Sequence, residues 1–350
     1  MTATPNYIVT TGDFIAEWME DAGINAAELA RRLGVTPKHV SELLNGKAPL
    51  SAHLALALER VTGVPARLWN MYEAGYREDL ARQDTVEDLA AQYEQARAFP
   101  LGYLRKFGFI QAPARDQAGT VRELLTLLGV ASLDAWRATW THGSVAYRRA
   151  AVGRDDAPAL SVWLTIAERG AGPESLAPYD DAALRELVPR LRALTAGDPA
   201  SSVAEATRLL REVGVALCFV PAVPGLGIHG ATRWITGHPV IQLSLLWKSD
   251  DQLWFTLFHE LGHVLLHGSK DLFLLGEHTA AESEADAYAS RLLIPDEYVA
   301  RLPVERDLAA VEALASELGI APSLVLGRAQ RETRDYAWGH SLRRQVDFSG

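Results

Sequence analysis

Two histidines stand four residues apart in the segment His259-Glu260-Leu261-Gly262-His263, which has the pattern HExxH. Residues four apart on an α-helix lie on one face, one turn apart, so both imidazoles can reach a single metal ion. The carboxylate of Glu260 follows the first histidine and can approach a metal-bound water from the side. Because zinc lowers the pKa of such a water toward ~7, a carboxylate can take its proton. The motif therefore predicts a zinc site with two histidine ligands and Glu260 as general base.

The surroundings of this motif favour a metal site over a chance match. Surface helices often carry His and Glu without binding any metal. Here the helix has mostly apolar neighbours, so we expect it to be buried, and two histidines and a glutamate are costly there unless something satisfies them. A metal ion would do so. The apolar neighbours are Trp254, Phe255, Leu257, Phe258, Val264, Leu265 and Leu266.

A third protein ligand is expected downstream, because catalytic zinc sites usually combine three protein ligands with one water. The segment 279–294 offers Glu282 and Asp286, which are four apart and share a helical face. We predict Glu282 as the ligand and Asp286 as the hydrogen-bond partner that fixes the tautomer of a ligand histidine. Glu284 lies roughly 200° around the helix from Glu282, so both cannot reach one ion. Glu284 as the ligand, and a merely solvated acidic face, remain the alternatives.

His267 is four residues beyond His263 and shares its face. It is too far along the helix to be an easy third ligand beside His259. It can line the cleft or stabilise an oxyanion in the transition state, or it is simply a satisfied histidine at the helix end.

The elements around the motif indicate the fold. Short apolar segments at 215–220, 231–235 and 240–243 predict strands, and 251–268 predicts the helix that carries the motif. Strands followed by a helix indicate an α+β domain over 206–350 with a small sheet. Residues 81–205 read as a helical middle region, with helical spacing at 85–97, 120–128 and 181–194, and no catalytic constellation.

TLFHELGHVLLHG followed by ESEADAYASRLLIP resembles the ImmA/IrrE family of zinc metallopeptidases, and the likeness covers about residues 206–300. The resemblance implies a zincin-like domain that binds one Zn²⁺ through His259, His263 and Glu282, with Glu260 as general base. It also implies a narrow protein substrate, such as a helix-turn-helix repressor. Tyr288 stands where phenylalanine is common, and His229, followed by Gly230-Ala231-Thr232, has no assigned role.

Residues 25–47 predict a helix-turn-helix motif. A helix with inward Leu29 and Leu33 ends at Gly34, and Thr36 can cap a second helix that has Pro37 at its first position. The second helix of such a motif can enter the major groove of DNA. The residues that we expect to contact DNA are Thr36, Lys38, His39, Ser41, Glu42, Asn45 and Lys47.

Residues 10–76 resemble the XRE-type domain of HigA-family antitoxins, which implies a homodimer bound to a palindromic double-stranded operator. The local charge mildly disfavours DNA binding, because residues 1–80 hold seven Lys/Arg against ten Asp/Glu, whereas a DNA-binding domain is usually basic. A helical bundle that binds protein is therefore the alternative. We expect residues 1–80 to form this N-terminal domain.

Composition limits the classes of partner and location that we expect for this protein. The 350 residues carry a formal net charge of −10, which argues against nonspecific adhesion to nucleic acid or anionic membranes. Cys218 is the only cysteine, so no internal disulfide can form. No apolar run approaches the ~20 residues of a membrane span, and residues 1–11 lack the features of a signal peptide. We expect a cytoplasmic protein with no membrane partner.

Two functions are consistent with these patterns. The first is a DNA-binding transcriptional regulator that cleaves a specific regulatory protein through its zinc-dependent endopeptidase domain. The second is an antitoxin-like repressor whose C-terminal domain senses a metal, ligand or partner without cleaving anything. The retention of Glu260 beside both histidines favours the first, since a sensor has no need of the base.

Overall fold

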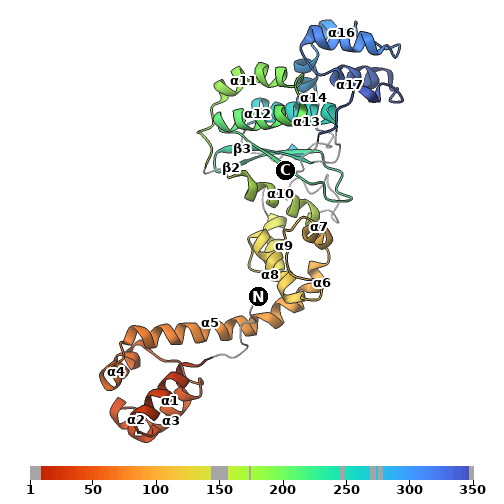
Figure 1. Cartoon of the computed structure of the whole chain (residues 1–350). Helices are drawn as coiled ribbons and strands as arrows, with labels where there is room; N and C mark the ends of the chain where they lie inside the picture. Colours follow the sequence, from red (N-terminus) through yellow and green to blue (C-terminus); the bar gives the residue numbers. More distant parts are fainter. Residues whose placement is uncertain are drawn as a thin grey trace. The chain divides into compact units, whose positions relative to one another are not determined.

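A computed structural model describes residues 9–142, 157–172, 175–244, 249–268, 273–274 and 279–346 (Figure 1). The chain divides into two compact units. One contains the residues up to Tyr93 together with Pro113–Val121, and the other contains Glu94–Ala112 and the chain from Arg122 onward.

Among the described residues of the first unit, helices α1 to α5 surround one apolar core. Their bounds are α1 Thr11–Asp21, α2 Ala26–Leu33, α3 Pro37–Leu44, α4 Ala52–Thr62 and α5 Ala66–Ala91. Leu29, Val40 and Leu58 are fully buried in this core. Helix α3 packs very close to α1. A Cβ added to Gly12 would lie only 2.1 Å from the Leu44 carbonyl oxygen.

The predicted helix-turn-helix elements form at the predicted residues. Asn25 caps α2 by accepting from the backbone N–H of Glu28, and Gly34 ends α2 in the left-handed conformation with φ of 69°. Thr36 then caps α3 through the N–H of His39, and Pro37 opens that helix. Each local signal in the sequence thus has the structural role that its chemistry suggests.

The predicted helical character of the middle region is confirmed, while the boundary that we placed at residue 80 lies inside the long helix α5. The further helices include those expected near 120–128 and 181–194. Their bounds are α6 Tyr93–Ala96, α7 Leu101–Lys106, α8 Gln117–Leu128, α9 Leu133–His142, α10 Ala157–Ala171, α11 Asp181–Leu194 and α12 Pro199–Glu212.

A four-stranded mixed sheet lies at the centre of the second unit, in the order β1-β3-β2-β4. The strands are β1 Ala216–Val220, β2 Gly230–Ile235, β3 His238–Ser244 and β4 Phe273–Leu274. β1 pairs with β3 in parallel, and β2 pairs antiparallel with both β3 and β4. The three strands that the sequence predicted are confirmed, and the two-residue β4 was not foreseen.

Helices cover both faces of this sheet (Figure 1). α13, Asp250–Leu266, packs on β2 and β3, and α12 packs on β1, whereas α10 covers the opposite face. Side chains alternate between the two faces: Leu217 and Ile241 join the core around α13, while Ala216 and Val240 pack with Ala171 of α10. The predicted α+β class is confirmed.

The remaining helices follow the sheet in sequence. They are α14 Ala280–Leu293, α15 Asp296–Val299, α16 Leu308–Leu318, α17 Pro322–Thr333 and the 3₁₀ helix η3 His340–Leu342. Within the ranges that the structure describes, no single helix has the length and apolar character to cross a bilayer. α16 and α17 meet that test only when taken as a pair, and they are bent by 119° at their junction.

Candidate metal centre

Helix α13 presents the three residues of the HExxH motif to the interior of the second unit. The side chains of His259, Glu260 and His263 are completely buried, because α13 lies between the sheet and α14. Burial of two imidazoles and a carboxylate on one helix is unfavourable unless each finds a partner. The sequence placed this helix at 251–268, close to its observed bounds.

Helix α14 supplies the third group. A Cβ added to Gly262 would lie 3.2 Å from Cα of Ala285, so the glycine lets α14 approach α13 closely. Glu282 is one turn before Ala285, as His259 is one turn before Gly262, and this approach brings the two side chains together. Thr279 caps α14 by accepting from the N–H of Glu282.

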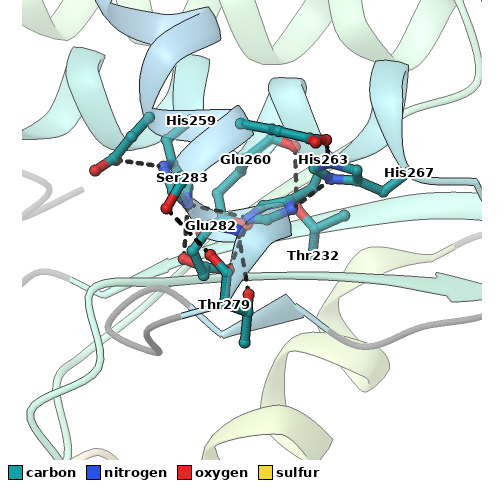
Figure 2. A network of polar contacts seen from close by, with 10 residues as sticks. Thr232, His259, Glu260, His263, His267, Thr279, Glu282 and Ser283 are labelled. Carbon is teal, nitrogen blue, oxygen red and sulfur yellow. Dashed lines mark hydrogen bonds and ion pairs between the residues drawn. The ribbon is translucent and has the colours of Figure 1, made fainter.

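Three ligand atoms converge at this point (Figure 2). Nε2 of His259 lies 3.0 Å from Nε2 of His263 and 3.1 Å from Oε2 of Glu282, and Nε2 of His263 lies 3.0 Å from Oε1 of Glu282. Tetrahedral zinc with bonds of ~2.0–2.1 Å separates its ligand atoms by about 3.3 Å. The observed spacing therefore fits such an ion after an opening of a few tenths of an ångström.

The electrostatics suit a group that carries positive charge. Burial opposes ionisation of Glu282, but hydrogen bonds with His259 and His263 outweigh it and lower its pKa to about 2. Burial also opposes a charge on His259, yet Asp286 and Glu282 raise its pKa to about 9, while burial lowers the pKa of His263. In the absence of an ion, His259 thus holds the proton that balances Glu282.

The outward nitrogens of both histidines have partners too. Nδ1 of His259 lies 2.9 Å from Oδ1 of Asp286, the carboxylate predicted to fix its tautomer. Nδ1 of His263 lies 3.0 Å from Nδ1 of His267, whose Nε2 lies 3.0 Å from Glu284. The structure therefore brings Glu282 to the histidine pair, whereas Glu284, with a side chain 64% exposed, contacts His267.

The carboxylate of Glu260 is not among the three converging groups and contacts strand β2 instead. Its Oε2 accepts a hydrogen bond of 2.7 Å from Thr232 of β2, and its Oε1 has no hydrogen-bond partner among the described residues. Burial raises the pKa of Glu260 to about 8, although His259 and the Thr232 hydroxyl favour its charged form. Sequence reasoning missed Thr232 and Gly230, because no local pattern connects residues of β2 with a helix 28 positions away.

The residues predicted to contact DNA lie on or beside α3. Thr36, Lys38, Ser41, Asn45 and Lys47 are exposed. His39 and Glu42 are only partly exposed, and Glu42 lies 3.7 Å from the ammonium of Lys38. Two expected contacts thus lie less open to solvent than the others, and the charge of Lys38 is partly balanced within its own helix.

The sheet, the buried HExxH helix and the converging ligand atoms define a zincin-like α+β domain. In agreement with this class, residues 215–329 match a peptidase family described as the IrrE N-terminal-like domain. Residues 15–69 match a helix-turn-helix family. The chain therefore carries an IrrE-like metallopeptidase-family domain and an N-terminal XRE-type helix-turn-helix domain.

A relative supports the assignment of the N-terminal part. The chain is 34% identical over 58 residues to the uncharacterized HTH-type transcriptional regulator YddM of Escherichia coli. The aligned segment is 17% of this chain and spans 62% of that protein's length. This chain therefore covers less than two thirds of that relative's length.

Proposed function

We propose that this protein is a transcriptional regulator whose IrrE-like domain is a zinc-dependent endopeptidase acting on a specific regulatory protein. The observation that carries the proposal is the convergence of His259, His263 and Glu282 beside the buried carboxylate of Glu260. One Zn²⁺ per chain suits these donors, since two imidazoles and one carboxylate are a usual set for catalytic zinc.

The zinc ion, when bound, supplies Lewis acidity that makes a water molecule acidic near neutral pH and polarises a peptide carbonyl. Glu260 receives the proton at Oε1, the oxygen without a partner among the described residues. Because burial raises its pKa, the Glu260 carboxyl can hold this proton and pass it to the leaving nitrogen. Asp286 and His267 meanwhile keep the rings of His259 and His263 in orientation.

Exchange of Glu260 for Gln tests the peptidase proposal. Glu260→Gln keeps the shape of the side chain but removes the proton acceptor, so we expect one zinc per chain and no cleavage. Glu297→Gln, at an exposed acid of α15 that is not one of the site residues described above, is the matched control and should retain cleavage. The assay mixes zinc-loaded protein with purified helix-turn-helix repressors encoded near its gene and detects fragments by mass spectrometry. Cleavage by Glu260→Gln at the wild-type rate would refute the proposal.

We further propose that the first unit binds a double-stranded operator as a homodimer. One helix-turn-helix motif reads a single half-site, so a dimer is needed to read a palindrome. The exposed residues of α3 and its ends are the proposed contacting surface, and a DNA partner supports a cytoplasmic location. We propose three functional regions, 1–80, 81–205 and 206–350, with α5 running across the first of these limits.

Lys38→Ala tests the DNA proposal. Loss of one phosphate contact should weaken operator binding and reduce the slope of log affinity against log salt by about 1. Lys106→Ala, in α7 of the other unit, should change neither quantity. Fluorescence anisotropy with labelled duplexes from the gene's own promoter measures both. If wild-type protein binds no duplex specifically at moderate salt, the first unit is a protein-interaction module instead.

A cavity favours the non-cleaving sensor as the second candidate function. It has a volume of about 300 Å³ and lies between α13, α14 and α17, with apolar walls that include Phe255, Leu293 and Leu324 and with Arg328 and Arg331 among its polar groups. A small ligand could occupy such a cavity close to the metal centre. If Glu260→Gln leaves regulation of the operator unchanged in cells while His259→Ala abolishes it, the sensor function is supported.

A further inference from the structure

Two residues of β2 face the carboxylate of Glu260. Gly230 and Thr232 are two apart on the strand and therefore point to the same face of the sheet, the face covered by α13. Thr232 is completely buried, and its hydroxyl lies 2.7 Å from Oε2 of Glu260. A Cβ added to Gly230 would lie 2.3 Å from Oε1 of the same carboxylate. Figure 2 shows Glu260 and Thr232 joined by this contact.

We propose that Thr232 and Gly230 are positioning residues that set the orientation of the Glu260 carboxylate. This proposal rests on the function proposed above, in which Glu260 moves a proton. Thr232 holds one oxygen by donating a hydrogen bond, and Gly230 leaves room for the other, so the two oxygens differ in their surroundings. Oε1, which receives no hydrogen bond from the residues that the structure describes, is then the oxygen available to a reacting water.

The hydroxyl of Thr232 has two acceptors within reach, and their distances decide between them. Oε2 of Glu260 lies at 2.7 Å, whereas the backbone oxygen of Glu260 lies at 3.3 Å. A hydroxyl has one proton to donate, and hydrogen bonds to a carboxylate are shorter and stronger than those to a neutral carbonyl. The carboxylate is therefore the principal acceptor, and Thr232 acts on its orientation more than on the helix backbone.

The strand that carries these residues is well suited to fix a side chain. β2 pairs with β3 over its whole length, with Gly230 opposite Leu243 and Thr232 opposite Ile241. Its other edge is also paired at Thr232, through β4. A strand held on both sides moves little, so the hydroxyl is a fixed reference for the carboxylate.

Gly230 acts through the space that it leaves and not through backbone freedom. Its φ lies outside the left-handed region, so alanine is compatible with its backbone. The added Cβ would, however, meet Oε1 of Glu260 at 2.3 Å and Cγ2 of Thr256 at 2.9 Å. With Thr256 also close, the Glu260 carboxylate must move, even though the Thr232 hydroxyl is still present.

The test uses three variants of the full chain: Thr232→Val, Thr232→Ser and Gly230→Ala. Crystal structures without added metal report the orientation of the Glu260 carboxylate directly. Cobalt-loaded protein is then titrated with acetohydroxamate, a bidentate chelator whose proton can pass to a carboxylate beside the metal, and its visible spectrum gives the affinity. Cobalt content and thermal unfolding show whether each variant folds and keeps the ion.

We expect the carboxylate to rotate in Thr232→Val and Gly230→Ala, and to stay in place in Thr232→Ser. Acetohydroxamate should bind about tenfold more weakly to the first two variants, with cobalt content unchanged, and within about twofold of wild type to Thr232→Ser. A merely structural role for the hydroxyl would alter the melting temperature without this pattern of loss and rescue.

The proposal is overturned if the carboxylate keeps its orientation in both Thr232→Val and Gly230→Ala, or if Thr232→Ser is as impaired as Thr232→Val. A different result marks failure of the zinc function itself: wild-type protein would take up no cobalt. In that case the metal-free crystal structures still decide whether Thr232 and Gly230 orient Glu260.

Discussion

Replacement of Asp286 by alanine is the most direct test of how the protein prepares a metal ligand. Oδ1 of Asp286 lies 2.9 Å from Nδ1 of His259 and accepts a hydrogen bond from it, which leaves Nε2 of that ring directed at Glu282 and His263. Without the carboxylate, the ring can adopt either tautomer and can rotate. Asp286→Ala should therefore weaken zinc binding without removing any ligand atom.

The size of this effect follows from the geometry. Loss of such a hydrogen-bond partner commonly reduces metal affinity about 10–100-fold. The side chain of Asp286 is 39% exposed, so water can replace part of the interaction and solvent screens its charge. We therefore expect the lower end of the range, about tenfold, which corresponds to ~1.4 kcal/mol.

Competition with a chromophoric chelator at pH 7.5 measures the affinity. Asp296→Ala is the matched control, because Asp296 borders the same surface hollow as Asp286 but is 73% exposed and lies near Arg291 instead of a histidine. It should bind zinc as tightly as wild type. Equal affinities for wild type and Asp286→Ala, within about twofold, would refute the role assigned to this hydrogen bond.

Three further predictions follow from individual groups. The pKa of His259 is raised to about 9, so zinc must displace a proton from this ring. Apparent zinc affinity should therefore rise about tenfold per pH unit from pH 7 to 9. A plateau above pH 7 in chelator competition would contradict this. Burial raises the pKa of the Cys218 thiol to about 11. Iodoacetamide at pH 8 should therefore modify the native protein about 100-fold more slowly than a model thiol of pKa 9. Equal rates would show the thiol to be accessible. Gly12→Ala should destabilise the first unit by ~1–3 kcal/mol in urea unfolding, because the added Cβ would overlap the Leu44 carbonyl. Gly75→Ala should not, because a Cβ added there meets no atom within 4 Å.

The parts of the fold that the sequence predicted are those determined by local chemistry. The cap Thr36, the following Pro37 and the left-handed Gly34 act within a few residues of their own position, so their types alone marked the helix-turn-helix elements. The spacing of His259 and His263 likewise acts within one helix, which is why the pair could be predicted to converge. Helical geometry allowed only one of Glu282 and Glu284 to reach the ion. We chose Glu282, which shares a face with Asp286, and the structure places it beside both histidines.

Other features depended on contacts between distant segments. Gly262 reads as a weak position in a helix, yet it sets the close approach of α14 that brings Glu282 to the histidines. His267 shares a face with His263, which left cleft lining, oxyanion contact and helix-end packing all open. In the structure its two ring nitrogens lie near His263 and Glu284, so its position supports a ligand histidine. Periodicity gives the face of a helix but not the side chains that the next helix sets against it.

The start of α13 shows how far such long-range control extends. Asp250 and Asp251 occupy the first turn, where acids are favoured by the helix dipole, so the sequence gives no reason to expect them buried. Both are buried, and the C-terminal tail balances them: Arg344 contacts Asp250 at 2.7 Å and Arg343 contacts Asp251 at 3.0 Å. A buried acid that lost its arginine would be strongly unfavourable, so the tail fixes the first turn of the helix that bears His259 and His263. These arginines lie beyond residue 329, where the match to the IrrE N-terminal-like domain ends, so a feature outside the matched range helps to hold its central helix.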